Sequence, residues 1–167
     1  VSYASQEEQI GTGHAAYVGM RNLPQHIKTV LVLGGDDSAF YTSETIMELI
    51  NSHIENKAAV SVLTVEKDDP SRLGRIIRDE NGDLVEIKEK EQIEKNEENI
   101  KEVNTGTYCF DRAWYEDAFL TMPIIEKLGE YGLNTSVSMA KKAGLGVNAV
   151  KIKNNEEWFG INTQKEL

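Results

Sequence analysis

Cysteine, positive charge and long apolar runs are all scarce in this sequence. Cys109 is the single cysteine in 167 residues, so neither an intramolecular disulfide nor a cysteine-based zinc site can form. A chain without disulfides is typical of a reducing compartment, and we expect a cytoplasmic location. Because no run of about 18 apolar residues is present, the sequence predicts no membrane span and no membrane partner.

Basic residues are outnumbered, with 18 Lys and Arg against 28 Asp and Glu, and the formal net charge is −10. Nucleic-acid-binding proteins usually carry a basic face, so we expect no nucleic-acid partner. An anionic small molecule would need backbone amides or a divalent cation to bind. The length fits one globular domain. Because the chain begins at Val1 and not at methionine, we expect it to be part of a longer polypeptide.

Four segments are predicted to be buried strands because they are rich in β-branched residues and are bounded by glycine, asparagine or aspartate. They are Thr29–Leu33, Ala58–Val65, Val103–Phe110 and Val147–Ile152. Two helical patterns lie among them: Ser43–Ile54, capped by Thr42 or Ser43, and Thr135–Ala143. Strands that alternate with helices predict a layered α/β fold with a mostly parallel, mixed sheet.

A β-hairpin is predicted to protrude from this fold. Gly74–Arg78 and Leu84–Lys88 flank the dipeptide Asn81-Gly82, which strongly favours a tight turn. The segment Glu86–Glu102 that follows is rich in acids and lysines, several of them four residues apart. Such pairs favour a solvated helix or another surface excursion.

The glycine-rich loop near the start of the chain allows two interpretations. Gly11–Ala16 matches G-x-G-x-x-A, a form of the dinucleotide fingerprint, and Asp36 or Asp37 could then bind a ribose. That fingerprint should directly follow an apolar strand, but the polar stretch Gln6–Gln9 lies there. An NAD-type dinucleotide-binding domain is therefore one alternative, and a loop that admits another ligand to its backbone is the other.

Polar residues end or interrupt the predicted strands at three places. Gly34-Gly35-Asp36 directly follows a strand, where glycines admit a ligand to the backbone and a carboxylate can hold a hard cation. Asn162 offers an amide oxygen that Mg²⁺ accepts. Residues 104–106, Asn-Thr-Gly, lie inside an apolar strand, where asparagine and glycine are unfavourable unless something approaches closely. A plain turn or a helix cap is the alternative for the first two.

Nucleophilic chemistry has no support in the sequence. His14, His26 and His53 lack the mutual spacing of a metal site or a catalytic triad, and we interpret all three as structural. We also find no serine or cysteine placed as an activated nucleophile.

Six motifs occur in the order and spacing of the sugar-phosphate nucleotidyltransferase family, which the chain resembles over nearly its whole length. They are Gln6–Ala15, Val30–Asp36, Leu73–Gly82, Glu86–Glu91, Glu102–Asp111 and Gly160–Asn162. Within that family the chain is most similar to bacterial uridylyltransferases that form UDP-N-acetylglucosamine. The resemblance implies a Rossmann-like three-layer fold. It also implies Mg²⁺-dependent transfer from a nucleoside triphosphate, with UTP favoured, to a sugar 1-phosphate, with N-acetylglucosamine 1-phosphate favoured.

The resemblance further implies which part of the ligands each site residue contacts. The uracil base would contact Gln6, Gly11 and Thr12, and the nucleotide and sugar would contact Gly34 and Gly35. The sugar would also contact Gly74, Glu89 and Asn104. Mg²⁺ would be bound by Asp36 and Asn162, and these two residues would act in catalysis through the metal.

The chain departs from the family pattern in three places. Gly34 stands where the family often has an aromatic residue before Gly-Asp, and Asp37–Phe40 replaces the usual proline-containing continuation. The family's glycine-rich phosphate loop would lie before Val1, so residues 1–167 would be the C-terminal major part of one nucleotide-diphospho-sugar transferase domain, an incomplete one. The family's acidic-Tyr-Tyr-Leu-Thr-Asp run stands here as Glu130–Thr135, without the aspartate. A non-catalytic sugar-nucleotide-binding protein or an inactive truncated homologue therefore stays an alternative. The sequence also leaves open whether the protein forms a homo-oligomer.

Overall fold

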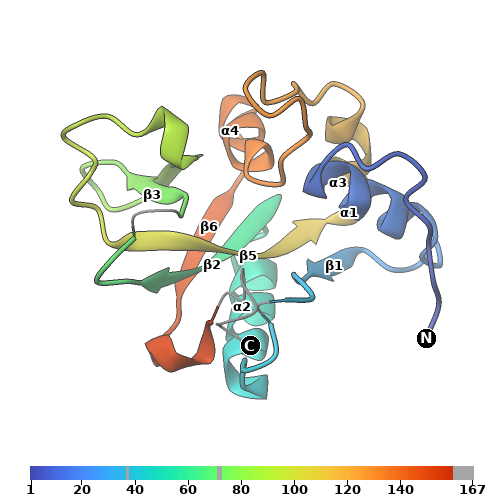
Figure 1. Ribbon diagram of the computed structural model, residues 1–167. Coiled ribbons are helices and arrows are strands. Elements are labelled where there is room, and N and C mark those ends of the chain that lie inside the picture. Colours follow the sequence, from blue (N-terminus) through green and yellow to red (C-terminus); the bar gives the residue numbers. More distant parts are fainter. Residues whose placement is uncertain (37, 71–72, 160–167) are drawn as a thin grey trace.

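The computed structural model describes residues 1–36, 38–70 and 73–159, and these residues form three layers. A central sheet is covered on one face by α2 (Ser43–Glu55) and on the other by α1 (Thr12–Arg21), α3 (Arg112–Phe119) and α4 (Thr135–Lys142), as Figure 1 shows. The expected three-layer α/β fold is confirmed. Among the described residues, no helix has the length and apolar content needed to cross a bilayer.

The sheet is mixed, and its strand order is β4-β3-β5-β2-β6, with β1 also paired to β5. The strands are β1 Thr29–Val32, β2 Val60–Glu66, β3 Arg75–Arg78, β4 Leu84–Lys88, β5 Glu102–Asp111 and β6 Val147–Lys151. The four predicted strands correspond to β1, β2, β5 and β6. Their ends shift by up to two residues, as is usual for element boundaries.

The expectation of a mostly parallel sheet is wrong in its proportions. In the described part of the chain, β2 and β6 form one parallel pair, and the other pairings are antiparallel. The physical reason is the place of β5. The crossover through α2 makes β1 and β2 point the same way, but β5 lies between them and runs opposite to both. The alternation of strands and helices does not reveal such an insertion.

Side chains that alternate along the strands build one apolar layer on each face of the sheet. On the face of α1, α3 and α4 the layer contains Met20, Val60, Val62, Tyr108, Phe110, Tyr115 and Val137. On the face of α2 it contains Leu49, Leu63, Val65, Val103, Cys109 and Trp158. Cys109 is a free cysteine and is fully buried in this second layer.

Side-chain caps begin two of the helices. The Thr42 hydroxyl accepts a hydrogen bond from the Thr45 backbone amide at the start of α2, as the sequence predicts. The Asp111 carboxylate accepts one from the Trp114 amide at 2.8 Å and so begins α3. The sequence reasoning missed α3 because β5 runs straight into it without a loop.

The predicted hairpin is confirmed as β3 and β4, and it extends from the left of the sheet in Figure 1. The charged segment after it is a surface excursion with one short helical turn, η1 (Lys90–Gln92). Lys88 pairs with Glu97 at 2.6 Å, nine residues along the chain, so the ion pair is not of the i,i+4 helical kind. Of the two predicted forms of this segment, the surface excursion is therefore confirmed, and the solvated helix is wrong.

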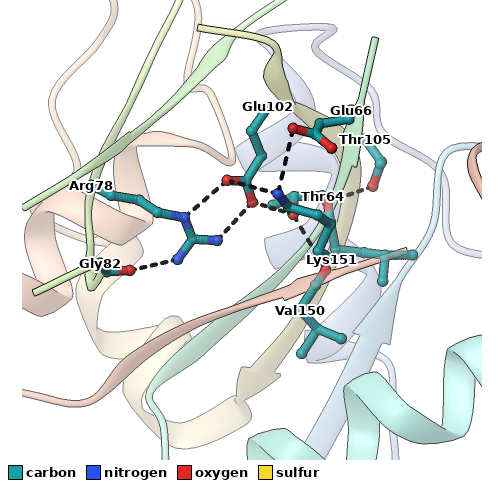
Figure 2. Close-up of polar contacts among 9 residues, drawn as sticks. Thr64, Glu66, Arg78, Gly82, Glu102, Thr105, Val150 and Lys151 are labelled. Carbon is teal, nitrogen blue, oxygen red and sulfur yellow. Dashed lines mark hydrogen bonds and ion pairs between the residues drawn. The ribbon is translucent and has the colours of Figure 1, made fainter. Parts of the chain in front are cut away.

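An ionic cluster joins the ends of four strands, and Figure 2 shows it in close-up. The guanidinium of Arg78 on β3 donates to both carboxylate oxygens of Glu102 on β5, at 2.6 and 2.9 Å. The hydroxyl of Thr64 on β2 donates to the same carboxylate at 2.6 Å, and the ammonium of Lys151 on β6 lies 3.9 Å away. The cluster fixes β5 against β2, β3 and β6.

Candidate functional site

The candidate site opens at a gap along one edge of β5. The strand β1 pairs with residues 108–111 of β5, and β3 meets the same edge at Val103. In the part of the chain that the structure describes, residues 105–107 of this edge therefore have no partner strand. A ligand can approach the sheet there.

A bulge in β5 produces the unusual sequence Asn104-Thr105-Gly106. The register of β2 against β5 shifts between Val62 and Thr64, and Gly106 has a φ of +79°, which favours glycine. The Asn104 amide is used locally: its oxygen accepts from the Gly106 amide at 2.9 Å, and its nitrogen donates to the Tyr108 hydroxyl at 2.8 Å. Asn104 therefore stabilises the bulge as well as facing the gap.

A cavity of about 740 Å³ lies over this gap, between β5, β1, α1 and the segment before α4. It brings together five residues, from four separate stretches, that the sequence had singled out. These are Thr12, Gly34, Asp36, Glu89 and Asn104. The volume is within the range of small-molecule sites.

Three of these residues lie at ends of strands. Gly34 and Asp36 lie two and four residues after the end of β1, and the Asp36 side chain is exposed at the cavity. Gly35, between them, is not among the residues that line the cavity, and a side chain there would point into open space. Glu89 follows β4 and lies on the opposite side of the gap.

Gly74 does not line the cavity, but it contacts two residues that do. Its carbonyl accepts from the Asn104 backbone amide at 3.0 Å. A Cβ on Gly74 would lie 3.6 Å from the Glu89 carboxylate, so the three predicted sugar-contacting residues are neighbours. Burial and the nearby charge of Glu91 raise the pKa of Glu89. A carboxyl group that is partly desolvated in a cleft is typical of functional sites.

Gln6 and Gly11, by contrast, do not line the cavity. The Gln6 amide donates to the Gly11 carbonyl at 3.2 Å and contacts the His14 ring at 3.1 Å. A Cβ on Gly11 would lie 2.5 Å from the Tyr131 carbonyl oxygen, so this glycine admits another part of its own chain. Their predicted role at the base is not tested by these contacts.

The dinucleotide-binding alternative lacks its structural context. Residues 1–10 are all described and form no strand, whereas the fingerprint needs a strand immediately before the glycines. The helix α1 also has Gly11 at its N-cap, where the backbone packs closely against Tyr131 of the same chain.

The segment before α4 contributes cavity residues that the sequence reasoning did not select. They are Glu130, Gly132, Leu133 and Asn134. The amide of Asn134 donates to the Glu89 carboxylate at 2.9 Å. A signal was available, since the family run that the sequence analysis placed at Glu130–Thr135 lies here, but its relation to Glu89 depends on a contact across 45 residues.

The electrostatics of the cavity are acidic. Asp36, Glu89 and Glu130 line it, and its described lining includes no lysine, arginine or histidine. Nor do the described residues contain a group of three histidines, cysteines or carboxylates that could hold a metal by themselves. The donors present suit a hard cation that binds to one or two protein oxygens and takes its remaining ligands from phosphates, as Mg²⁺ does.

Asn162, the second predicted metal ligand, lies outside the described residues, and so does Gly160. The described residues just before it are held close to the segment that follows Asp36. The Glu157 carboxylate accepts from the Thr42 backbone amide at 3.1 Å and from the Thr42 hydroxyl at 3.0 Å. The Trp158 indole donates to the Thr105 carbonyl at 3.1 Å, on the strand that carries Asn104.

Two of the three histidines make packing contacts. His53 is buried and lies 3.0 Å from the Ser61 hydroxyl, and burial lowers its pKa. His14 stacks on Phe119 with ring centroids 5.8 Å apart. Neither residue lines the cavity.

The chain is similar to known proteins in both sequence and fold. Residues 1–160 match the family model described as Nucleotidyl transferase. The chain is 38% identical over 167 residues to the bifunctional protein GlmU of Exiguobacterium sibiricum and 36% identical over 165 residues to that of Heliobacterium modesticaldum. These matches cover 100% and 99% of this chain but 37% and 36% of the relatives, so the chain spans about a third of their length.

A solved structure shares the fold. It was assigned as a glucose-1-phosphate thymidylyltransferase from Bacillus anthracis and contains sucrose; the match has a TM-score of 0.72 and 19% identity, and covers 96% of this chain and 59% of that one. This likeness supports the Rossmann-like three-layer architecture. The match of residues 1–160 to the family model shows that the chain belongs to the nucleotidyl transferase family.

Proposed function

We propose that the polypeptide containing this chain transfers a nucleotidyl group from a nucleoside triphosphate to a sugar 1-phosphate. UTP and N-acetylglucosamine 1-phosphate are the favoured substrates, and the products are a nucleoside-diphosphate sugar and pyrophosphate. The observation that carries the proposal is the cavity in which Thr12, Gly34, Asp36, Glu89 and Asn104 meet. The relatives named GlmU support the choice of substrates.

In the proposed reaction an oxygen of the sugar phosphate forms a bond to the α-phosphorus, and the bond to pyrophosphate breaks. No enzyme nucleophile is needed, so the protein contributes positioning and charge stabilisation. Thr12, with Gln6 and Gly11 behind it, would face the base. Glu89 would accept hydrogen bonds from the sugar and Asn104 would donate to it, with Gly74 beside them.

Asp36 and Asn162 would hold Mg²⁺, which when bound would neutralise charge on the phosphates. The acidic lining makes such a cation necessary for a triphosphate to enter. The hydrogen bonds between Thr42 and Glu157 support the pairing, because they tie the segment after Asp36 to the segment before Asn162.

The domain assignment belongs to the same proposal. Residues 1–167 would form the C-terminal major part of one nucleotide-diphospho-sugar transferase domain, whose phosphate loop precedes Val1. The chain's span of about a third of its relatives is consistent with this.

The variant Asp36→Asn tests the metal site in the polypeptide that contains this chain. We expect pyrophosphate release to fall by about 100-fold or more, because one group that stabilises transition-state charge is lost. Calorimetry should show weaker binding of UTP in the presence of Mg²⁺. The control Asp68→Asn also removes one negative charge, from an exposed ion pair with Lys101 outside the cavity, and should leave both unchanged. Normal turnover by Asp36→Asn would contradict the proposal.

A non-catalytic sugar-nucleotide-binding protein is the second candidate. It is favoured by one observation, the absence of any cationic side chain from the described lining of the cavity. The two candidates differ in a single assay. Binding of UDP-sugars by calorimetry without pyrophosphate release from UTP and sugar 1-phosphate would support the binding protein and exclude the transferase.

A further inference from the structure

Asn134 is wedged between two other residues of the candidate site. It is buried, with 8% of its surface exposed, and its amide nitrogen donates to Oε1 of Glu89 at 2.9 Å. Its amide oxygen fills the space beside Gly132, where a Cβ would overlap it. The absence of a side chain at position 132 is therefore what allows Asn134 to turn toward Glu89.

Glu89 makes further hydrogen bonds with residues that are close to it in the chain. It is the N-cap of η1: its backbone carbonyl accepts from the Gln92 amide at 2.8 Å, and the Gln92 side chain accepts from the Glu89 amide at 3.1 Å. The carboxylate lines both the main cavity and a smaller cavity of about 360 Å³. Charged groups around it are Glu86, Glu91, Glu126 and Lys127 on the smaller cavity and Asp36 and Glu130 on the main one.

We propose that Asn134 is a positioning residue that fixes the Glu89 carboxylate toward the main cavity, and that Gly132 is required to make room for it. The inference rests on the proposed function, in which Glu89 accepts hydrogen bonds from hydroxyl groups of the sugar. A carboxylate with one oxygen held by a buried amide presents its other oxygen in a defined direction. A freely rotating carboxylate would have to be ordered when the sugar binds.

A purely structural role for Asn134 predicts different behaviour. If Asn134 only joined the segment before α4 to η1, its loss would lower stability without affecting one substrate more than the other. A positioning role instead predicts that the sugar side of the site is weakened selectively. The KM of each substrate, measured separately, distinguishes the two roles.

The first experiment compares Asn134→Ala with wild type in the polypeptide that contains this chain. We expect the KM for the sugar 1-phosphate to rise about tenfold, while the KM for the nucleoside triphosphate stays within about twofold. Asn148→Ala is the matched control, because Asn148 also donates a side-chain hydrogen bond, to Ser52 at 2.7 Å, but lies on β6 away from the cavity. Equal changes in both KM values for Asn134→Ala would overturn the proposal.

The second experiment tests Gly132. A Cβ there meets the Asn134 oxygen and also the flexible Cδ1 of Ile125 at 2.6 Å. Gly132→Ala should therefore raise the sugar 1-phosphate KM in the wild-type background. It should have little further effect when Asn134 is already alanine, because the displaced amide is no longer present. Additive effects of the two substitutions would count against the coupling.

A readout without turnover separates this inference from the proposed function. The pKa of Glu89, followed by carboxyl ¹³C NMR in the free protein, should be higher in Asn134→Ala than in wild type, because a donor to the charged form is lost. An unchanged pKa would overturn the positioning role. If the pKa rises but Glu89→Gln leaves the sugar 1-phosphate KM unchanged, the positioning contact stands and the assigned role of Glu89 in the proposed function fails.

Discussion

At the scale of single residues, Gly11 and Gly13 at the start of α1 allow another segment of the same chain to pack closely against the backbone. The backbone amide of Gly13 donates to the Tyr131 carbonyl at 2.7 Å, and the Tyr131 amide donates to the Ile10 carbonyl at 2.9 Å. Gly11 lies between these bonds with a φ of +110°, a conformation that other residues adopt at a cost. The glycines thus join the loop before α1 to the segment that lines the cavity.

Substitution of Gly11 tests this close approach. We expect Gly11→Ala to lower the free energy of unfolding by about 2–4 kcal/mol, because it combines a strained φ with a clash against backbone. Gly19→Ala is the control, since Gly19 is in the interior of α1 with nothing within 4 Å of the added methyl group, and it should raise stability by about 0.5–1 kcal/mol. Urea denaturation measures both. Equal effects of the two would contradict the account.

At the scale of elements, the start of α2 and the short helix η2 (Asn155–Glu157) are joined by one carboxylate. Hydrogen bonds from Thr45 and Thr42 lower the pKa of Glu157, so it stays charged at neutral pH. The contact spans 115 residues and links the segment after Asp36 to the residues before Asn162. We interpret it as support for the predicted metal pair.

The variant Glu157→Ala should loosen that link. We expect the Mg²⁺ concentration for half-maximal pyrophosphate release to rise about fivefold, equivalent to the loss of about 1 kcal/mol of hydrogen bonding. Glu156→Ala removes an exposed carboxylate from the adjacent position and should leave the Mg²⁺ dependence unchanged. A magnesium titration of activity is the measurement, and an unchanged midpoint for Glu157→Ala would contradict the interpretation.

At the scale of the whole molecule, the ionic cluster at Glu102 joins four strands and makes the stability of the fold depend on pH (Figure 2). Burial alone would raise the pKa of Glu102, but hydrogen bonds from Arg78 and Thr64 and the charges of Arg78 and Lys151 hold it below its ordinary value of 4.5. The folded protein therefore keeps this carboxylate charged where the unfolded chain begins to protonate it. Its stabilising effect is complete above that value and is lost as the pH falls through the folded pKa.

Replacement of Glu102 by glutamine tests the coupling. We expect Glu102→Gln to lower the free energy of unfolding by about 2 kcal/mol near pH 7, because Arg78 loses its buried partner. The difference from wild type should shrink as the pH falls below 4.5 and through the lowered folded pKa of Glu102, because the wild-type carboxyl then also becomes neutral. Urea denaturation across this range is the measurement. A difference that does not depend on pH would show that the carboxylate charge is not responsible.

Much of the fold could be predicted from short-range patterns. The capped helix after Thr42, the hairpin turn at Asn81-Gly82 and the buried strands follow from local preferences. The position of Gly34 and Asp36 at a cavity could be predicted because ligands bind beyond the ends of strands. The helix α3 could not, since its cap Asp111 is also the last residue of β5.

The sequence by itself determined the layered α/β architecture, the protruding hairpin and the acidic character of the site, because turns, caps, alternation and charge are properties of neighbouring residues. Only the tertiary structure decided that β5 lies between β1 and β2, that its bulge leaves a gap, and that Asn134 meets Glu89 across 45 residues. Contacts of this kind depend on how separate elements pack, and no local pattern encodes which distant partner fills the space beside a glycine such as Gly132.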